Sequence, residues 1–521
     1  MGPVCCSLCL SMSGNTCLPF KDLLKRLGRC PMGSLTIVSL HRWTEFADVD
    51  RVLEQCLSDL GGMERFVRPG QTVVIKPNIT ANAPASSGGT THVELVEAIV
   101  RQVQRCAPAR VIVAEGTQAF GTTLESAFPS GGWREMAART GVELFNLDVG
   151  PHVEVRVENG RYPRSIPFSK LVLDADVLIS VPCLKTHLSA DYTVALKNHY
   201  ALTPQWKRSE IHGEYLLEEA LVDLNRIRKA DLIVVDGWEG AEGIAGGIAF
   251  DRPAGARVMI AGTDPVAVDV VSKEIMALTG DTRYLRWAAE DGVGIGDLAR
   301  IEIRGTSLAE CRHPFMTPAQ ELCLSLPEVT ICDQRACSGC RIPALSVLGR
   351  LRFQKMLKPL TLVFGDEGES PTVKGQVVVI GDCAQRYAAL GLYVPGCPPK
   401  VEDILRAVDA TGCVCHTCRD TAGRILGQFS GNPAFLAHLR VTASGTQVYA
   451  GDQVKRDEWH LELLVGDCME RYARVIMERA AHFGLDAERD IIWLRGCPVE
   501  EGAIREALYR LERAAATVVA M

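Results

Sequence analysis

The sequence has no hydrophobic run long enough to cross a membrane. Its most apolar stretch, residues 171–184, is interrupted by Asp174 and Asp176, whereas a membrane-spanning helix needs about 20 mostly apolar residues. An excess of basic residues is also missing, because 56 Lys and Arg stand against 63 Asp and Glu for a net charge of −7. That balance gives no reason to expect a nucleic-acid partner. We therefore expect a cytoplasmic protein with no membrane span.

Two further absences bound the chemistry. Twenty cysteines in 521 residues are too few for a disulfide scaffold and suit a reducing compartment. Neither a P-loop nor a Gly-x-Gly-x-x-Gly pattern is present, even in the glycine-rich segment 240–247. Electrons for a redox reaction would then come from a ferredoxin-like protein or a partner subunit, because no nicotinamide or flavin site is indicated.

Residues 1–31 differ from the rest of the chain. They contain five cysteines but lack the cationic start, the long apolar core and the small-residue cleavage site of a secretory signal. Regular strand and helix patterns begin after Met32, so we expect a dispensable leader and a natural start at that residue. A third metal site built from the leader cysteines is the alternative.

The last two hundred residues contain an internal repeat built on cysteine. In each copy a Cys-x-x-Cys-Arg motif is followed by Gly-Asp-Cys, then by Arg-Tyr-Ala, and then by Gly-Cys-Pro. The cysteines at equivalent places are Cys337, Cys340, Cys383 and Cys397 in copy one and Cys415, Cys418, Cys468 and Cys497 in copy two. Cys332 and Cys413 lie outside this register. Four thiolates per copy predict one metal centre in each.

The spacing of these thiolates favours an iron–sulfur cluster over zinc. Structural zinc usually takes two closely spaced cysteine pairs. Each copy here has one pair and two separate cysteines, and a cubane cluster accepts such dispersed ligands because its corners point in four directions. We expect two [4Fe–4S] clusters, with zinc and metal-free buried thiols as the alternatives.

The segment around Cys397 resembles a known cluster site. Tyr393-Val-Pro-Gly-Cys-Pro-Pro399, followed by Glu402, is similar to the cluster-binding segment of NiFe-hydrogenase small subunits and of the related quinone-reductase subunit. The resemblance implies that Cys397 ligates a [4Fe–4S] cluster. Copy two has Arg495 and Val499 in place of the two flanking prolines, so the two clusters are expected to differ in potential.

Residues 35–310 alternate strands with helices, which predicts an α/β domain with a mostly parallel sheet. Strands are expected at 35–40, 72–75, 110–114, 176–181, 232–235 and 257–261, and helices at 93–106, 216–229 and 265–278. Ligands bind at the carboxyl ends of the strands in such sheets. Thr91 and Asp264 are predicted to cap helices at that edge, and a helix N-terminus favours an anionic ligand.

Reactive side chains follow each of the last five strands and together predict a shared cleft for a small anionic molecule. Lys185, His187 and Lys197 are the candidates for catalysis, because crowded cations can bind an anion or supply acid–base chemistry. The candidates for substrate binding are Lys76, Asn78, Glu115, Asn198, Asp236 and Asp264. For any one of these residues taken alone, a solvated loop side chain is the alternative.

The order of these motifs identifies a family. Lys76-Pro-Asn, Lys185-Thr-His, Ala195-Leu-Lys-Asn and Asp264-Pro-Val-Ala-Val-Asp resemble the domain-of-unknown-function 362 family over residues 35–310. Members often carry an iron–sulfur module, so the resemblance implies a fold and a cofactor but no reaction. The Lys-x-His element is also similar to one in the lactate-racemase-like family.

We expect an α/β domain followed by a duplicated small α/β iron–sulfur module. The predicted parts are the leader (1–31), the α/β domain (32–310), a linker (311–329) and the two repeats (330–410 and 411–521). One hypothesis is a redox enzyme whose two clusters pass electrons to the anion at the strand ends. The other is an assembly or carrier protein for a metallocofactor, with structural clusters. The sequence leaves open which of these holds and whether the chain forms a homodimer.

Overall fold

The chain divides into two compact units in the computed structural model. The structure describes residues 35–518 apart from 81–82, 118–122, 130, 245–251, 334, 352–355, 367, 369, 432, 444–445, 452–459, 479, 481–485 and 497. The N-terminal unit comprises the described residues up to Glu321 together with Cys337–Gly339, and the C-terminal unit comprises Leu322–Ala336 and the residues from Cys340 onward. Among the helices of the described residues, none is both long enough and apolar enough to span a membrane.

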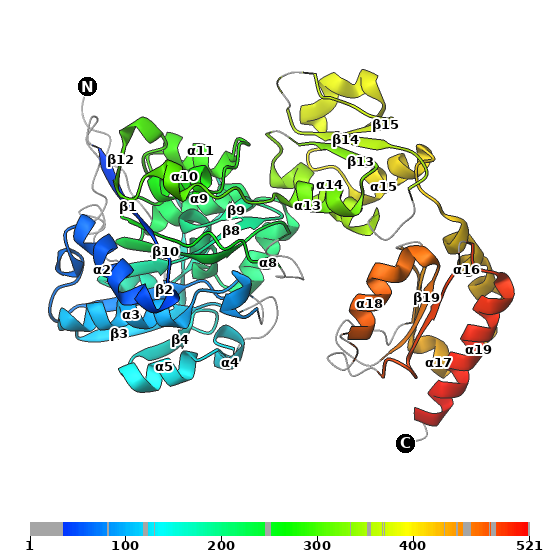
Figure 1. The fold of residues 1–521 in the computed structure, drawn as a ribbon, viewed down its shortest axis with the longest axis horizontal. Helices are drawn as coiled ribbons and strands as arrows, with labels where there is room; N and C mark the ends of the chain where they lie inside the picture. The colour runs from blue at the N-terminus through cyan, green and yellow to red at the C-terminus, as the bar shows by residue number, and fades with distance from the viewer. Residues whose placement is uncertain are drawn as a thin grey trace. The chain divides into compact units, whose positions relative to one another are not determined.

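A ten-stranded, mostly parallel sheet forms the centre of the N-terminal unit, which confirms the predicted α/β architecture (Figure 1). Its main path has the order β12-β1-β11-β10-β7-β2-β3-β4, and a hairpin of β8 and β9 pairs with β10 off this path. The strands are β1 (Thr36–Arg42), β2 (Thr72–Pro77), β3 (Arg110–Glu115), β4 (Glu143–Asn146), β7 (Val177–Val181), β8 (Cys183–His187), β9 (Asp191–Thr193), β10 (Leu232–Ala241), β11 (Val258–Gly262) and β12 (Ile301–Gly305). A separate hairpin joins β5 (His152–Val155) to β6 (Ile166–Ser169).

Helices cover both faces of this sheet, and its central strands are therefore buried along almost their whole length. Alternate residues of a strand belong to different cores. In β2, for example, Val73 and Ile75 join the core under α2 and α3, whereas Val74 joins the core under α9, α10 and α11 (Figure 1). The helices are α2 (Val49–Asp59), α3 (Val93–Arg105), α4 (Leu124–Ala127), α5 (Trp133–Thr140), α6 (Lys170–Asp174), α7 (Ala195–Asn198), α8 (Gln205–Gly213), α9 (Leu217–Ile227), α10 (Pro265–Ile275), α11 (Arg283–Glu290) and α12 (Leu308–Cys311).

One strand of the main path runs against its neighbours. β2, β3, β4, β7 and β10 share one direction, but β11 is antiparallel to both β10 and β1. In the register, Gly262 at the end of β11 lies opposite Ile233, near the start of β10. The expectation that all five site-bearing strands end at one edge is therefore wrong for β11.

The C-terminal unit contains two four-stranded sheets, each with three parallel strands in the same order. The first has β14 (Leu360–Phe364), β15 (Gln376–Ile380) and β16 (Leu392–Val394), and the second has β17 (Leu439–Ala443), β19 (Leu461–Val465) and β20 (Ile491–Leu494). The fourth strand differs between the sheets. β13 (Val329–Cys332) is parallel to β14, whereas β18 (Thr446–Ala450) is antiparallel to β17.

The helices of the two copies also follow one order. α14 (Ser338–Leu351) and α16 (Thr417–Gln428) begin at the Cys-x-x-Cys motifs, and α15 (Val401–Ala410) and α19 (Glu501–Val518) follow the last strand. Between the last two strands, copy one has only a 3₁₀ helix, Asp382–Leu390, where copy two has α18 (Glu470–Glu478). Two further helices are α13 (Pro318–Ser325) and α17 (Pro433–Ala437).

Candidate functional site

The β8–β9 hairpin places three polar side chains beside the ends of β2 and β3. Lys185 and His187 lie two residues apart on β8, so their side chains leave the strand on the same face. Thr193 on β9 pairs with Lys185 across the hairpin. The helix α7, which is four residues long, follows directly and supplies Lys197 and Asn198.

These elements enclose a cavity of about 140 Å³. Seven of the nine predicted site residues line it, namely Lys76, Asn78, Glu115, Lys185, His187, Lys197 and Asn198. The rest of the wall is Ile79, Thr80, Gly116, Thr117, Thr193, Tyr200, Ala201 and Arg208. Four lining residues are lysine or arginine and one is glutamate, so the wall has an excess of positive charge.

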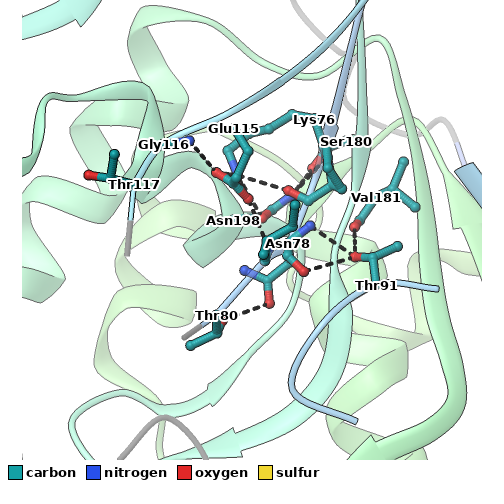
Figure 2. Close-up of polar contacts among 12 residues, drawn as sticks. Lys76, Asn78, Thr80, Thr91, Glu115, Gly116, Thr117, Ser180, Val181 and Asn198 are labelled. Atoms are coloured by element: carbon teal, nitrogen blue, oxygen red, sulfur yellow. Dashed lines mark hydrogen bonds and ion pairs between the residues drawn. The ribbon is translucent and has the colours of Figure 1, made fainter. Parts of the chain in front are cut away.

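Lys76 and Glu115 form a buried ion pair that joins β2 to β3 (Figure 2). The ammonium of Lys76 lies 2.9 Å from one Glu115 oxygen and donates a hydrogen bond to the side-chain oxygen of Asn198 at 3.1 Å. Asn198 in turn donates to Ser180 at 2.9 Å, and Glu115 accepts the backbone N–H of Ile79 at 3.0 Å. Burial lowers the pKa of Lys76, while the Glu115 carboxylate opposes that shift.

Lys185 is held by oxygen atoms from three segments. Its ammonium donates to Asn78 Oδ1 at 2.7 Å, to Thr80 Oγ1 at 2.9 Å and to the carbonyl of Gly89 at 2.9 Å. The side chain is buried, and burial lowers its pKa to about 8. Lys185 is thus fixed in orientation, which suits a residue that fastens the strand ends and contributes charge to the wall.

Lys197 differs from the other cavity lysines. Among the residues that the structure describes, its ammonium makes neither an ion pair nor a hydrogen bond, and it lies 5.8 Å from the centre of the Tyr200 ring. The side chain is half-buried. Burial, together with repulsion from Lys185 and Lys76, lowers its pKa to about 7. At neutral pH the amine is therefore present in both its charged and its neutral forms.

His187 presents one nitrogen to the backbone and keeps its proton on the other. Its Nδ1 accepts the backbone N–H of Ser189 at 3.0 Å, so the neutral ring carries its hydrogen on Nε2. Burial lowers the pKa of His187 well below its usual value, and the nearby charge of Lys197 adds to this shift. The imidazole on the cavity wall is therefore a neutral hydrogen-bond donor.

Two of the cavity residues that were not predicted from the sequence, Thr193 and Arg208, carry polar groups that bear on the site. Thr193 is buried, and its hydroxyl has no hydrogen-bond partner among the described residues. Arg208 on α8 donates to the carbonyl of Thr117 at 3.0 Å and pairs with Asp148 at 3.1 Å. The strand that carries Thr193 has only three residues, too few for a recognisable pattern, and no motif surrounds Arg208.

Two predicted ligand-binding residues have structural roles instead. Asp264 follows the reversed strand β11, so it lies at the opposite edge of the sheet, where its carboxylate caps α10 through the N–H groups of Val266 and Ala267. Asp236 does not line the cavity. Its carboxylate accepts the backbone N–H of His92 at 2.7 Å and pairs with the His92 ring at 2.9 Å.

The N-terminus of α3 was expected to attract an anionic ligand, but the carboxylate of Asp236 already lies there and accepts the N–H of His92. His92, not Thr91, caps α3, and no side chain of the cap makes a capping hydrogen bond. The hydroxyl of Thr91 instead donates to the carbonyl of Val181 at 2.8 Å and accepts the N–H of Asn78 at 2.9 Å. The predicted capping box at Thr91 is wrong, because these contacts take its hydroxyl away from the helix.

Asp269 on α10 determines the position of α7. It is completely buried, and its Oδ1 accepts the N–H of Ala195 at 2.7 Å, at the start of α7. Its Oδ2 has no hydrogen-bond partner among the described residues. Burial raises the pKa of this carboxyl well above its usual value. Asp269 is thus a positioning residue for Lys197, two residues further along α7.

We predict that Asp269→Asn makes stability less dependent on pH. The folded wild type holds a proton that the unfolded chain releases above about pH 4. The free energy of unfolding of the wild type should therefore fall as pH rises from there toward the folded pKa. Asparagine keeps an acceptor for Ala195 and has no proton to lose. In chemical denaturation from pH 5 to 8, the free energy of unfolding of the wild type should fall relative to that of the variant as pH rises. A difference that stays constant with pH would mean that Asp269 is ionised in the folded protein.

In copy one, three hydrogen bonds hold the Gly-Asp-Cys turn against the Gly-Cys-Pro turn. The N–H of Gly381 donates to the carbonyl of Val394 at 2.8 Å, and the N–H of Asp382 donates to the carbonyl of Gly396 at 3.2 Å. The N–H of Gly396 donates back to Asp382 Oδ1 at 2.8 Å. The turns that carry Cys383 and Cys397 are therefore fixed side by side.

Copy two repeats this arrangement. Gly466 donates to the carbonyl of Leu494 at 2.9 Å, Asp467 donates to the carbonyl of Gly496 at 3.1 Å, and Gly496 donates to Asp467 Oδ1 at 2.9 Å. The glycines at equivalent places all have positive φ, 86° and 110° at the first turn and 127° and 128° at the second. The glycine turns of the two copies thus share their hydrogen bonds and the positive φ of their glycines.

The predicted cysteine ligands are placed unequally. Cys337 and Cys340 are buried, and Cys383 and Cys397 are exposed. In copy two Cys418 is buried and Cys415 is half-buried, while Cys497 and the side chain of Cys468 lie outside the described residues, as do the five leader cysteines. Within the described part of the chain, no three or more His, Cys, Asp or Glu side chains are grouped closely enough to hold a metal ion.

Cys340 lies directly against the Gly-Asp-Cys turn. A Cβ at Gly381 would be 2.5 Å from Cys340 Sγ. Gly62 provides a matched control because its φ and ψ, 85° and 162°, are close to the 86° and 154° of Gly381. A Cβ at Gly62 would meet only the tip of the exposed Glu64 side chain.

We predict that Gly381→Ala is more damaging than Gly62→Ala. Both changes introduce backbone strain of about 1–3 kcal/mol, but only the first also overlaps Cys340, which adds about 1–3 kcal/mol. In metal-free protein, Cys340 should react faster with N-ethylmaleimide in Gly381→Ala than in the wild type or in Gly62→Ala, as measured by peptide mass mapping. Equal rates in all three would contradict the contact.

Comparisons with known proteins agree with the extent of the site. The family described as "Domain of unknown function (DUF362)" matches residues 73–274, a span that contains every residue of the cavity wall. Thylakoid-associated protein sll1697 from Synechocystis sp. is 31% identical over 294 residues, which are 53% of this chain and 83% of that protein. Among solved structures, the lactate racemase apoprotein from Thermoanaerobacterium thermosaccharolyticum matches 76% of this chain and 92% of its own, with 11% identity and a TM-score of 0.31.

Proposed function

The chain belongs to the family described as a domain of unknown function (DUF362). Because that description leaves the reaction open, we propose a function from the residues of this chain. We propose that it is an iron–sulfur redox protein whose N-terminal unit binds a small anionic molecule in the cavity at Lys197. The observation that carries this proposal is the ammonium of Lys197, which lines a positively charged cavity without an acceptor among the described residues.

The charge balance of the cavity supports an anionic ligand. Lys76 is paired with Glu115, and Arg208 is paired with Asp148, whereas Lys197 has no such carboxylate among the described residues. A partly buried cation without a counter-charge is costly, and a bound carboxylate or phosphate would offset that cost. Binding would also raise the pKa of Lys197 and hold the amine in its charged form.

Lys197 and His187 would have different tasks in a reaction. A lysine with a pKa near 7 can accept or give up a proton at neutral pH. The neutral imidazole of His187 would donate a hydrogen bond from Nε2, because its Nδ1 is engaged by Ser189. Lys76, Asn198 and Glu115 would keep the strand ends in register around the ligand.

The shared turn geometry supports a cluster in each repeat. Cys340 Sγ lies against the turn that carries Cys383, and that turn is bonded to the one that carries Cys397. Loading would require the exposed thiols of Cys383 and Cys397 to rotate inward, a rotamer change that leaves the two turns in place. Cys337, three residues before Cys340, would be the fourth thiolate.

The clusters, when bound, would supply one-electron transfer. We propose a cytoplasmic location with a ferredoxin-like electron donor. The Synechocystis relative is named as thylakoid-associated, so a membrane surface is the alternative location.

The competing function is a carrier for a metallocofactor with structural clusters. Reversible cluster reduction that changes the bound anion would favour the redox protein, and redox-silent clusters with stoichiometric cofactor transfer would favour the carrier.

Anion binding should depend on Lys197 and on pH. We expect calorimetric titration with oxalate and with inorganic phosphate to give saturable binding that Lys197→Ala weakens by at least about tenfold, because a charged hydrogen bond is lost. Affinity should fall as pH rises through about 7, where the free amine loses its proton. The control is Lys170→Ala, since Lys170 pairs with Asp174 on the surface and its loss should leave affinity unchanged. Equal affinity in the wild type and in Lys197→Ala would refute the site.

Protein purified without oxygen should contain about eight irons and eight sulfides. Cys383→Ser should remove or impair one cluster and leave the other, so that iron falls by about half and the electron paramagnetic resonance signal of the reduced protein is simplified. Cys332→Ser is the control, because Cys332 is a half-exposed thiol at the end of β13 in the first sheet but lies outside the repeated register. Zinc in place of iron, or equal iron loss in both variants, would refute the assignment.

A further inference from the structure

Among the described residues, the Lys197 amine of the cavity has no hydrogen-bond acceptor. Lys76 and Lys185 each donate to several oxygen atoms at 2.7–3.1 Å. The ammonium of Lys197 has neither a hydrogen bond nor an ion pair among the described residues, and it lies 5.8 Å from the centre of the Tyr200 ring. An ammonium that served only to fasten the wall would be expected to have protein acceptors like those of its two neighbours.

We propose that Lys197 forms a reversible imine with a carbonyl group of the small anionic molecule that enters this cavity. The inference rests on the proposed function, because it concerns the same ligand and the same cavity. It assigns the ligand to a chemical class, that of small carbonyl compounds with an anionic group, such as 2-oxo acids. It also gives Lys197 a covalent role in addition to its charge.

The bonds of this step balance without another reactant. The neutral amine attacks the carbonyl carbon, a C–N bond forms, and the carbonyl π-electrons move to oxygen. Both amine hydrogens leave with that oxygen as water, and a C=N double bond replaces the C=O bond. Hydrolysis reverses the sequence, so no oxidant or reductant is consumed.

Three features of the cavity suit this chemistry. Burial and two neighbouring lysines keep a large fraction of Lys197 neutral at pH 7, and only the neutral amine is a nucleophile. The Nε2–H of His187 can donate to the oxygen that departs from the carbonyl carbon. The buried hydroxyl of Thr193 has no protein partner among the described residues and lines the same wall, so it can hydrogen-bond the anionic group.

The size of the cavity agrees with a small ligand. Its volume of about 140 Å³ is close to the roughly 150 Å³ of an engineered cavity that binds benzene. A ligand of about six non-hydrogen atoms, such as a three-carbon 2-oxo acid, therefore fills it. A nucleotide is several times larger and would leave most of its atoms outside.

The test is reductive trapping on the full-length wild-type protein. Glyoxylate or pyruvate is added with cyanoborohydride at pH 7, and peptide mass mapping measures the adduct at every lysine. We expect Lys197 to be modified at least tenfold faster than the exposed Lys358 and Lys400, because an ordinary lysine has less than about 0.1% neutral amine at that pH. The advantage should shrink toward pH 10, where exposed lysines also lose their protons.

Two controls separate this proposal from the one it rests on. Lys197→Arg keeps the charge but cannot form an imine, so it should bind oxalate and give no adduct at position 197. Oxalate has no ketone or aldehyde, so it should slow trapping at Lys197 in the wild type without forming an adduct. If oxalate binds and Lys197 is trapped no faster than Lys358 and Lys400, the imine is refuted and the anion site stands. If trapping at Lys197 is fast but oxalate neither binds nor competes, the amine is reactive and the anion site is refuted.

Discussion

A lysine and a glutamate, both almost completely buried, face each other across the ends of β2 and β3. Glu115 neutralises Lys76, and Asn198 binds the same ammonium from α7, so one ion pair joins two strands to the helix that carries Lys197. Removing either partner would leave the other charge buried and uncompensated, a loss of about 3–5 kcal/mol. Lys185 on β8 is held by Asn78, just beyond the end of β2, and by Thr80 and Gly89. Lys76, Lys185 and Arg208 all have acceptors within the protein, whereas Lys197 has none among the described residues.

The sequence indicated much of this site because the motifs are local. Strand ends followed directly by Lys76, Glu115 and Lys185 required only the rule that parallel strands end at one edge. The rule failed for Asp264 because β11, the strand before it, runs antiparallel to its neighbours. The direction of a strand depends on its pairing in the sheet and cannot be predicted from five apolar residues. Thr193 escaped notice for a related reason, since its place in the cavity comes from a hairpin too short to predict. Asp236 binds His92 instead of lining the cavity, and these two residues are 144 positions apart in the chain. A local sequence pattern cannot predict such a contact.

The two repeats were recognised because their cysteine motifs occur in the same order with the same neighbours. In the structure, equivalent positions of the two copies make equivalent backbone hydrogen bonds. Each copy bonds one turn to another with the same three hydrogen bonds, two from glycine N–H groups and one from aspartate. Glycine is required at these places because φ is positive and because Cys340 leaves no room for a Cβ at Gly381. The edge strand and the connecting helix are free of such constraints, and there the copies differ, with β13 against β18 and a 3₁₀ helix against α18. Sequence spacing could indicate the shorter connection in copy one but not the reversed edge strand in copy two.

The helix α10 joins the cap at Asp264 to the contact that positions α7. Asp264 caps its first turn, and Asp269, a little over one turn further on, accepts the N–H of Ala195 at the start of α7. Because an α-helix rises about 1.5 Å per residue, these two carboxylates attach to the helix only about 7.5 Å apart along its axis. The first carboxylate thus begins α10, and the second positions the segment that carries Lys197.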